Sequence, residues 1–230
     1  SHPPEPGRTR LESIVDRGVL HVCYPLEAGM PFAYFNARDE LVGFDVDMVH
    51  SLARGVGVTL EFVPLKTSFA REGVAEALDS GYCDIVARGL PVSMQDVAKI
   101  AYSTPYLDFS IGFLVADHRR EEFNRREAVE GSRDLRLAIP DVPYYRERMQ
   151  RFLPHAELIP IRDYPTFVAD ESGRFDAMIA AVEVASSWSL LHPRFGLVVP
   201  QPPFQDLPLA YALPLGEFAW NGAVDTWIEL

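Results

Sequence analysis

The sequence has few cysteines and few basic residues, and each shortage excludes some functions. Cys23 and Cys83 are its two cysteines, and 21 lysines and arginines stand against 33 aspartates and glutamates, a formal net charge of −12. Binding to nucleic-acid phosphates needs a basic surface, so we predict no nucleic-acid partner. The densest basic segment lies between residues 119 and 126, where arginines alternate with glutamates; this favours a solvated helix.

Long apolar runs are also missing. No stretch is long enough to cross a bilayer, and the start, SHPPEPGRTR, lacks the apolar segment of a secretory leader, as expected of a mature or excised domain. Hydrophobic residues still make up 48% of the 230 residues, which is ample for a packed core. We therefore expect a soluble globular protein with either one large α/β domain or two lobes.

Motifs for metals, cofactors and the common catalytic mechanisms are absent from the sequence. The two cysteines lack metal-site spacing and fall at a strand end and in the turn before another strand. They could form the disulfide of an exported protein or remain buried thiols. The six histidines are scattered, and no phosphate loop, CxxC pair or HExxH motif is present. We predict neither a cofactor nor a metal.

Strand and helix signals alternate along the chain, which favours mostly parallel sheets covered by helices. Predicted strands cover residues 19–24, 59–64, 84–88, 111–116, 135–139, 158–160, 177–181, 197–199 and 209–213. Predicted helices cover residues 11–18, 45–54, 72–80, 119–127 and 219–230, and a further one begins at Ser93. The pattern restarts near residue 111. We therefore expect one lobe of residues 1–114 with 207–230 and a second of residues 115–206, with two crossings near 114–117 and 203–209.

Three segments carry a resemblance to a known family. They are GVLHVCY, PFAYFNARDELVGFDVDMVHSLARGVGVTLEFV and ALDSGYCDIVARGLPVSMQDVAKIAYSTPY. In this order and spacing they resemble the first lobe of type II periplasmic solute-binding proteins, family 3, the polar-amino-acid group. The resemblance implies an α/β fold of two lobes, each with a mostly parallel sheet flanked by helices, that closes on a small-molecule ligand.

Shorter strings carry a narrower resemblance. GLVVPQPPF, DVPYY and VDTWIEL are similar to the binding domain appended to some membrane transporters of the cation:dicarboxylate symporter type. This similarity implies a periplasmic or extracytoplasmic location, with a tether to the inner membrane as one arrangement. It also implies a partner, namely a membrane transporter or receptor module in the same or another chain.

The residues that bind amino acids in this family are replaced here. A family arginine grips the ligand carboxylate with two hydrogen bonds, but the matching segment places Asp96 at that position. Because a carboxylate there would repel another, we expect Asp96 to be structural and to form a helix capping box with Ser93. In the second lobe the acid that holds the ammonium group corresponds to Ala181. Glu183 either replaces that acid or merely begins a helix.

Other residues are candidates for a cleft with a different ligand chemistry. Arg88, at a predicted strand end, could bind an anionic group or pair with a neighbouring acid, and Gly89 would let the backbone approach a ligand. Aromatic residues commonly wall such pockets. The predicted ligand-binding residues are Tyr24, Phe32, Tyr34, Arg88, Gly89, Ser93, Tyr144 and Glu183.

Two alternatives to a binding protein stay open. The same fold houses cyclohexadienyl dehydratases, which remove water and carbon dioxide with a second-lobe glutamate, and DAMIAAVE (residues 176–183) is faintly similar to the segment that carries it. The spacing differs by one residue, so we predict a binding protein and no enzyme. The other alternative is a pair of lobes whose cleft is vestigial and whose role is to contact a partner protein.

Overall fold

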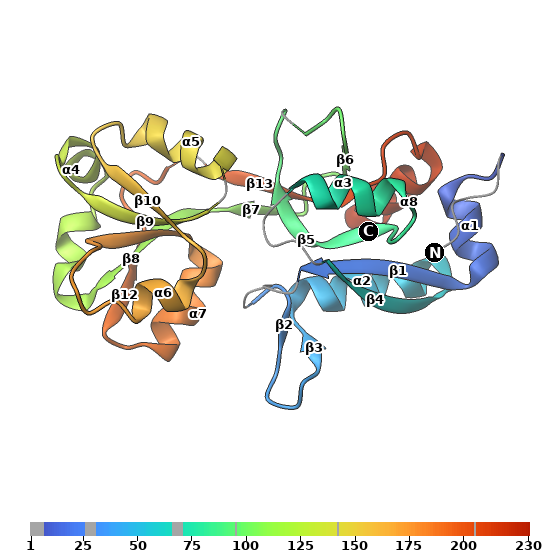
Figure 1. Ribbon diagram of the computed structural model, residues 1–230, viewed down its shortest axis with the longest axis horizontal. Helices are drawn as coiled ribbons and strands as arrows, with labels where there is room; N and C mark the ends of the chain where they lie inside the picture. The colour runs from blue at the N-terminus through green and yellow to red at the C-terminus, as the bar shows by residue number, and fades with distance from the viewer. Residues whose placement is uncertain (1–6, 26–30, 66–70, 95, 142, 205) are drawn as a thin grey trace. The chain divides into compact units, whose positions relative to one another are not determined.

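The computed structural model describes residues 7–25, 31–65, 71–94, 96–141, 143–204 and 206–230. It divides into two compact units, Ser1–Asp108 with Pro208–Leu230, and Phe109–Leu207. Each unit has a mixed sheet flanked by helices (Figure 1), which confirms the predicted two-lobed α/β fold. The chain passes from the first unit to the second after Asp108 and returns at Pro208.

The sheet of the first unit has the strand order β4-β1-β5-β13-β6, and β7 also pairs with β13. Its strands are β1 (Val19–Pro25), β4 (Thr59–Leu65), β5 (Ile85–Pro91), β6 (Ala101–Tyr102), β7 (Leu107–Phe109) and β13 (Leu207–Leu213). Strand β1 runs parallel to β4 and β5, so the carboxyl ends of these three strands meet at one edge. Strand β13 runs antiparallel to β5.

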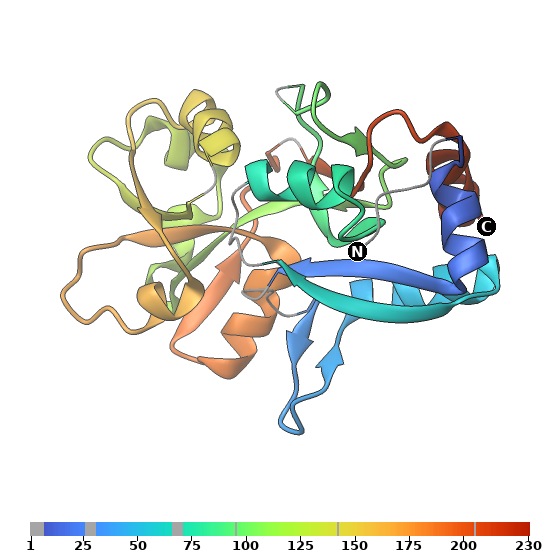
Figure 2. The same cartoon turned by 45° about the vertical axis from the view of Figure 1, so that its right-hand side comes forward.

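Helices cover both faces of this sheet. They are α1 (Arg10–Arg17), α2 (Phe44–Val56), α3 (Arg71–Asp79) and α8 (Phe218–Glu229). One face packs against α1, α2 and α8 through residues such as Leu20, Val49 and Trp220, and the other packs against α3. Helices α1 and α8 lie side by side (Figure 2). A hairpin of β2 (Tyr34–Phe35) and β3 (Leu41–Val42) projects from the unit (Figure 1).

The sheet of the second unit has the order β10-β9-β11-β8-β12. Its strands are β8 (Ile111–Ala116), β9 (Arg136–Pro140), β10 (Glu157–Ile161), β11 (Ala177–Ala181) and β12 (Phe195–Val198). Strands β10, β9 and β11 are parallel, and β8 is antiparallel to β11 and β12. The helices are the 3-10 helix η1 (Asp117–Phe123), α4 (Arg126–Gly131), α5 (Pro143–Phe152), α6 (Tyr164–Val168) and α7 (Val182–Leu191).

Several local predictions are wrong. Residues 119–127 do not form one helix: η1 ends where Phe123 enters the core, and α4 begins at Arg126. The described residues from Ser93 to Lys99 form hydrogen-bonded turns, so Ser93 begins no helix there. The helix predicted over residues 45–54, with Asp45 as its cap, instead begins at Phe44: Gly43 takes the N-cap position of α2, and the Asp45 side chain is buried.

Strand β8 lies where the first crossing was expected. Its residues pair along their length with β11 on one side and β12 on the other, and these are strands of the second unit. The extended backbone of residues 111–116 is as predicted, but its hydrogen bonds belong to the second sheet. The segment that leaves the first unit is β7, which ends just before β8 begins.

The two cysteines form a disulfide. The bond joins Cys23 of β1 to Cys83, directly before β5, and both residues are fully buried. Of the two states that the sequence left open, the structure therefore has the oxidised one. A structural disulfide is typical of proteins that fold outside the reducing cytosol.

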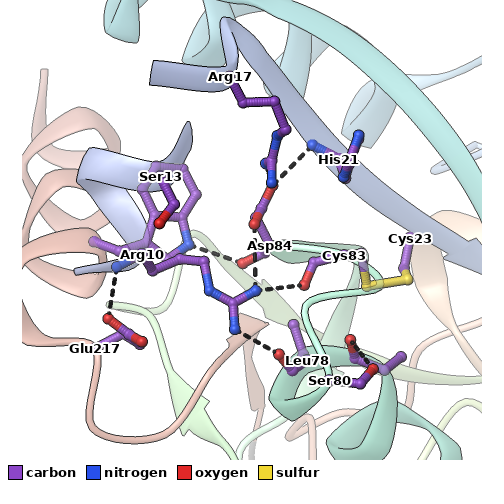
Figure 3. A network of polar contacts seen from close by, with 12 residues as sticks. Arg10, Ser13, Arg17, His21, Cys23, Leu78, Ser80, Cys83, Asp84 and Glu217 are labelled. Carbon is purple, nitrogen blue, oxygen red and sulfur yellow. Dashed lines mark hydrogen bonds and ion pairs between the residues drawn. A yellow bond between two sulfur atoms is a disulfide. The ribbon is translucent and has the colours of Figure 1, made fainter. Parts of the chain in front are cut away.

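A buried ion-pair network lies beside the disulfide (Figure 3). Asp84 is 0% exposed, and its two carboxylate oxygens lie 3.3 Å from Arg10 Nη1 and 2.5 Å from Arg17 Nη2. Arg10 also donates hydrogen bonds to the backbone carbonyls of Leu78 and Cys83. Buried charges are tolerated when they are paired and hydrogen-bonded in this way. The network fixes α1 against the start of β5.

Candidate ligand-binding site

Three predicted ligand-binding residues lie along one edge of the first sheet. The pairs between β1 and β5 include Cys23 with Val86, so Tyr24 stands near the end of β1 and Arg88 and Gly89 follow in β5. Strand β5 runs on to Pro91, further than predicted, because Leu90 and Pro91 pair with β13. Ligands of α/β proteins bind at this carboxyl-end edge. The edge is therefore the part of this unit best placed to contact a ligand.

The predicted aromatic residues lie around the base of the hairpin. The ring of Tyr24 meets those of Phe35 and Phe62 edge-on, at centroid distances of 6.0 and 6.2 Å. Tyr34 pairs with Val42 across the hairpin, and the Phe32 carbonyl accepts a hydrogen bond of 2.9 Å from the Asp45 amide. Tyr24 therefore packs through its ring, while these contacts of Tyr34 and Phe32 are made by their backbones. Their contact with a ligand stays a prediction.

A buried carboxylate lies behind this edge, and the sequence did not single it out as a site residue. Asp45, in the first turn of α2, is 0% exposed. Its Oδ1 accepts hydrogen bonds from the hydroxyls of Tyr106 and Tyr211, both at 2.8 Å, and its Oδ2 accepts one from the Gly89 amide at 3.4 Å. Polar groups that are buried need such partners. Asp45 thus joins a helix, strand β5 and two distant tyrosines.

Burial raises the pKa of Asp45 to about 6, against the lowering effects of the two phenols, the Gly89 amide and the charge of Arg88. Burial and the Asp45 charge raise the pKa of both Tyr106 and Tyr211, so these hydroxyls remain protonated and donate. The effect of Arg88 on Asp45 fits the ion-pair interpretation of this arginine. Its role as an anion-binding residue stays a prediction.

Ser93 and Asp96 are both buried. An oxygen of the Asp96 carboxylate accepts a hydrogen bond of 3.3 Å from the Tyr102 hydroxyl of β6. Asp96, at the place of the family arginine, is thus engaged within its own unit. This supports the structural role that we expected for it, although the helix that it was expected to cap is absent from the described residues.

In the second unit three helices begin directly after three neighbouring parallel strands. Helix α5 follows β9, α6 follows β10 and α7 follows β11, so their amino-terminal turns gather at the carboxyl edge of the sheet. Tyr145, Tyr164 and Glu183 lie in these turns. Burial raises the pKa of both tyrosines, with a further contribution to Tyr164 from the charge of Glu183 and to Tyr145 from Tyr164. The three side chains therefore interact in series.

Glu183 is half-buried, and within the described part of the chain its Oε2 is enclosed without a hydrogen-bond partner. Burial raises the pKa of this carboxyl group, and the charge of Asp206 adds to the rise. A carboxylate oxygen that lacks a partner can accept a hydrogen bond from a cationic group. The side chain of the predicted Tyr144 lies outside the described residues.

Sequence reasoning missed Asp45, Tyr106, Tyr164 and Tyr211. One of them had a usable signal, because Tyr164 comes shortly after a predicted strand of a parallel sheet, where ligand-binding residues collect. In the described ranges no helix is long and apolar enough to cross a membrane. No three histidine, cysteine or acidic side chains of those same ranges are grouped so as to hold a metal.

Comparison with known proteins decides the family. Residues 23–184 match the bacterial extracellular solute-binding proteins, family 3. The chain belongs to this family. This confirms the resemblance to type II periplasmic solute-binding proteins that the motifs of the first lobe carried.

Three relatives of this family 3 protein are informative. It is 28% identical to a cyclohexadienyl dehydratase of Pseudomonas aeruginosa in an alignment of 227 residues that covers 96% of this chain and 81% of the relative. It is 26% identical to an L-cystine-binding protein of Escherichia coli K12 over 174 residues, 74% of this chain and 61% of the relative. The crystal structure of the ancestral amino acid-binding protein AncCDT-1, a precursor of cyclohexadienyl dehydratase, matches with a TM-score of 0.80 and 27% identity, over 95% of this chain and 92% of that one.

Proposed function

We propose that this family 3 protein is an extracytoplasmic binding domain for a small organic anion or an amino-acid-like molecule, serving transport or sensing. The two units, which we equate with the expected lobes, would close on the ligand, because a ligand that touches both favours the closed state. The relatives named as amino-acid- and cystine-binding proteins support this class of ligand. The disulfide supports the extracytoplasmic location.

The observation that carries the proposal is the enclosed Oε2 of Glu183 beside Tyr164. A half-buried carboxylate that leaves an oxygen without a partner costs stability, and an ammonium group of a ligand would remove that cost. On the first unit Arg88 is the proposed partner for an anionic group. A ligand with one positive and one negative group would carry a charge opposite to that of each of these two residues.

The ligand would be held without the usual carboxylate clamp of the family. Asp96 stands at the arginine position and accepts a hydrogen bond from Tyr102, and Ala181 stands where an acid holds the ammonium group. We therefore propose that Arg88 takes the role of the family arginine and that Glu183 takes the role of the family acid. Tyr24, Phe32, Tyr34, Gly89, Ser93 and Tyr144 complete the proposed contact set.

The proposed partner is a membrane transporter or receptor module, in the same or another chain. The similarity of the GLVVPQPPF and VDTWIEL strings to domains appended to symporter-type transporters is the reason for this part of the proposal. A pull-down of solubilised inner-membrane proteins, with and without ligand, would identify such a module. Recovery of the same membrane protein from both samples would instead favour an interaction domain that needs no ligand.

A thermal-shift screen tests the binding function. L-arginine, L-cystine, L-glutamate, succinate and prephenate are suitable probes. A ligand at 100 times its dissociation constant adds about 2.7 kcal/mol to the free energy of unfolding, a rise in melting temperature of roughly 5–10 °C for a chain of this size. If no probe of any class raises the melting temperature, the binding proposal fails, and the vestigial cleft is favoured.

Three variants test the residues assigned to the site. Arg88→Ala and Glu183→Gln are expected to abolish the shift by a positive probe, whereas Asp96→Ala, with its carboxyl already engaged by Tyr102, is expected to keep it. Each shift is measured relative to the ligand-free melting temperature of the same variant, so that differences in basal stability cancel. If Asp96→Ala loses the ligand-induced rise in melting temperature and Arg88→Ala keeps it, the assignment of Arg88 to the ligand site is rejected.

A second candidate function is that of a cyclohexadienyl dehydratase. The relative with this activity aligns along 96% of the chain, and the raised pKa of Glu183 is a property of general acids. Incubation with prephenate and detection of an aromatic product separates the two functions. Turnover that Glu183→Gln abolishes would establish the enzyme, while a thermal shift by prephenate without turnover would leave the binding proposal in place.

A further inference from the structure

The two tyrosines that bond to Asp45 come from the two segments that carry the chain between the units. Tyr106 directly precedes β7, from which the chain leaves the first unit, and Tyr211 lies in β13, by which it returns. The Tyr106 amide donates a hydrogen bond of 3.0 Å to the Leu209 carbonyl, and the two phenol rings stack at a centroid distance of 4.2 Å. The outgoing and returning segments are thus paired through both backbone and side chains.

The third bond of Asp45 reaches the edge where we place the ligand. Its Oδ2 accepts from the Gly89 amide, and Gly89 follows Arg88 in β5. The backbone there is crowded: a Cβ on Gly89 would lie 2.4 Å from the Tyr106 hydroxyl oxygen and 2.7 Å from Leu209 Cδ1. Gly89 therefore lies in close contact with both Tyr106 and Leu209 of the returning strand.

We propose that Asp45 is a positioning residue that holds the Gly89 backbone and both crossing segments in one arrangement, so that a change at the ligand edge of β5 and a change in the crossing segments occur together. This inference rests on the proposed binding function, for which the crossing segments are the hinge. One carboxylate accepts all three bonds. Its protonation weakens them at the same time.

The groups that act on the Asp45 carboxyl come from three parts of the unit. They are the hydroxyl of Tyr106 before β7, the hydroxyl of Tyr211 in β13, and the Gly89 amide and Arg88 guanidinium of β5. All four lower the pKa of Asp45, which burial nevertheless raises to about 6. Titration near this pH offers a way to switch the arrangement without a ligand.

The test uses the whole 15N-labelled chain without any ligand, with amide spectra recorded between about pH 4 and pH 8. The amides of Gly89, Leu107 and Leu209 are expected to shift with one common midpoint near the Asp45 pKa of about 6. Asp45→Asn is expected to abolish this common transition. The matched control is Asp47→Asn, which removes an exposed acid from the same turn of α2 and is expected to leave the transition unchanged.

Tyr106→Phe gives a second readout that a merely structural role of Asp45 would not move. Loss of one hydrogen bond to the carboxylate raises its pKa, so the common midpoint is expected to rise by about one pH unit at all three amides. Separate midpoints, or a transition that persists in Asp45→Asn, would overturn the proposal. Because no ligand is present, a negative ligand screen leaves this result intact, and the two proposals fail independently.

Discussion

Trp220 of α8 donates its indole N–H to the backbone carbonyl of Asp84 at 2.8 Å, across 136 positions of the chain. The side chain of Asp84 pairs with Arg10 and Arg17 of α1, and the Arg10 amide donates to Glu217 just before α8. One residue before β5 therefore fixes both terminal helices of the first unit (Figure 3). Stability of the unit should depend on it.

Asp84→Asn is expected to lower the free energy of unfolding by about 3–5 kcal/mol, because it leaves the guanidinium of Arg10, only 4% exposed, without its charged partner. Urea denaturation measures the change. Asp79→Asn, at the exposed end of α3, is the control and should change stability by less than about 0.5 kcal/mol. Equal effects of the two substitutions would show that the network contributes little.

Loss of the Cys23–Cys83 disulfide is expected to destabilise the protein by about 4 kcal/mol, since the bond closes a loop with a sequence separation of 60. The double variant Cys23→Ala/Cys83→Ala is compared with the wild type in urea denaturation. The wild type in reductant should approach the stability of the double variant, which itself should not respond to reductant. Two titratable thiols in the native wild type would contradict the bond.

Local sequence patterns predicted the strands well. They failed where long-range contacts determine the secondary structure of a segment. Strand β11 has the bounds predicted from its apolar run, because it is buried on both faces between two layers of helices. The helix predicted from Ser93 rested on capping residues alone. Met94 is 81% exposed and Val97 41%, so the segment has no apolar face to pack, and it forms turns. Capping signals therefore need an apolar stripe beside them before they predict a helix.

The candidate site was harder to predict than the fold for a similar reason. Asp45 was assigned to a helix start from its place in the sequence, but its burial comes from tyrosines 61 and 166 positions away. Glu183 was found because a family resemblance drew attention to its segment. Its interaction with Tyr164 depends on the adjacency of β10, β9 and β11, which sequence spacing does not reveal.

The pH dependence of stability should contain a distinct contribution from Asp45. Its pKa is about 6 in the folded protein and about 3.9 in the unfolded chain, so the folded state binds more protons between these values. The contribution is full below about pH 4 and is lost as the pH rises through about 6, by up to about 3 kcal/mol. Urea denaturation of wild type and Asp45→Asn over this pH range measures the contribution of Asp45, as the difference between their free energies of unfolding.

The comparison with Asp45→Asn is needed because other acids contribute to the free energy of unfolding with the opposite pH dependence. Hydrogen bonds to Thr166 and to Ser172 lower the pKa of Asp163 and Asp170, respectively, so these acids add stability that is lost as the pH falls. Both contributions are common to wild type and variant and cancel in the comparison. A stability difference that stays flat between pH 4 and pH 6 would show that Asp45 is already ionised throughout.

Gly89→Ala is expected to destabilise the protein by about 1–3 kcal/mol, because the added methyl group would displace Tyr106 or Leu209 from close contact. It should also weaken the thermal shift by any positive ligand, since the carboxyl edge of β5 would move. Gly55→Ala is the matched control: it lies in α2 with open space around its Cα and should stabilise by about 0.5–1 kcal/mol. Tolerance of Gly89→Ala would mean that the crossing segments adjust freely.

Glu183→Gln should separate stability from binding. In the ligand-free protein the carboxylate has an enclosed oxygen without a described partner and a pKa raised by burial, so its neutral amide analogue is expected to raise the melting temperature by about 1–2 °C near neutral pH. Glu157→Gln, an exposed acid on β10, should leave it unchanged. A variant that gains stability while losing its ligand response is the behaviour of a residue retained for binding. A lower melting temperature would instead show that the Glu183 carboxylate is satisfied within its own unit, and the ligand would then have to be held elsewhere.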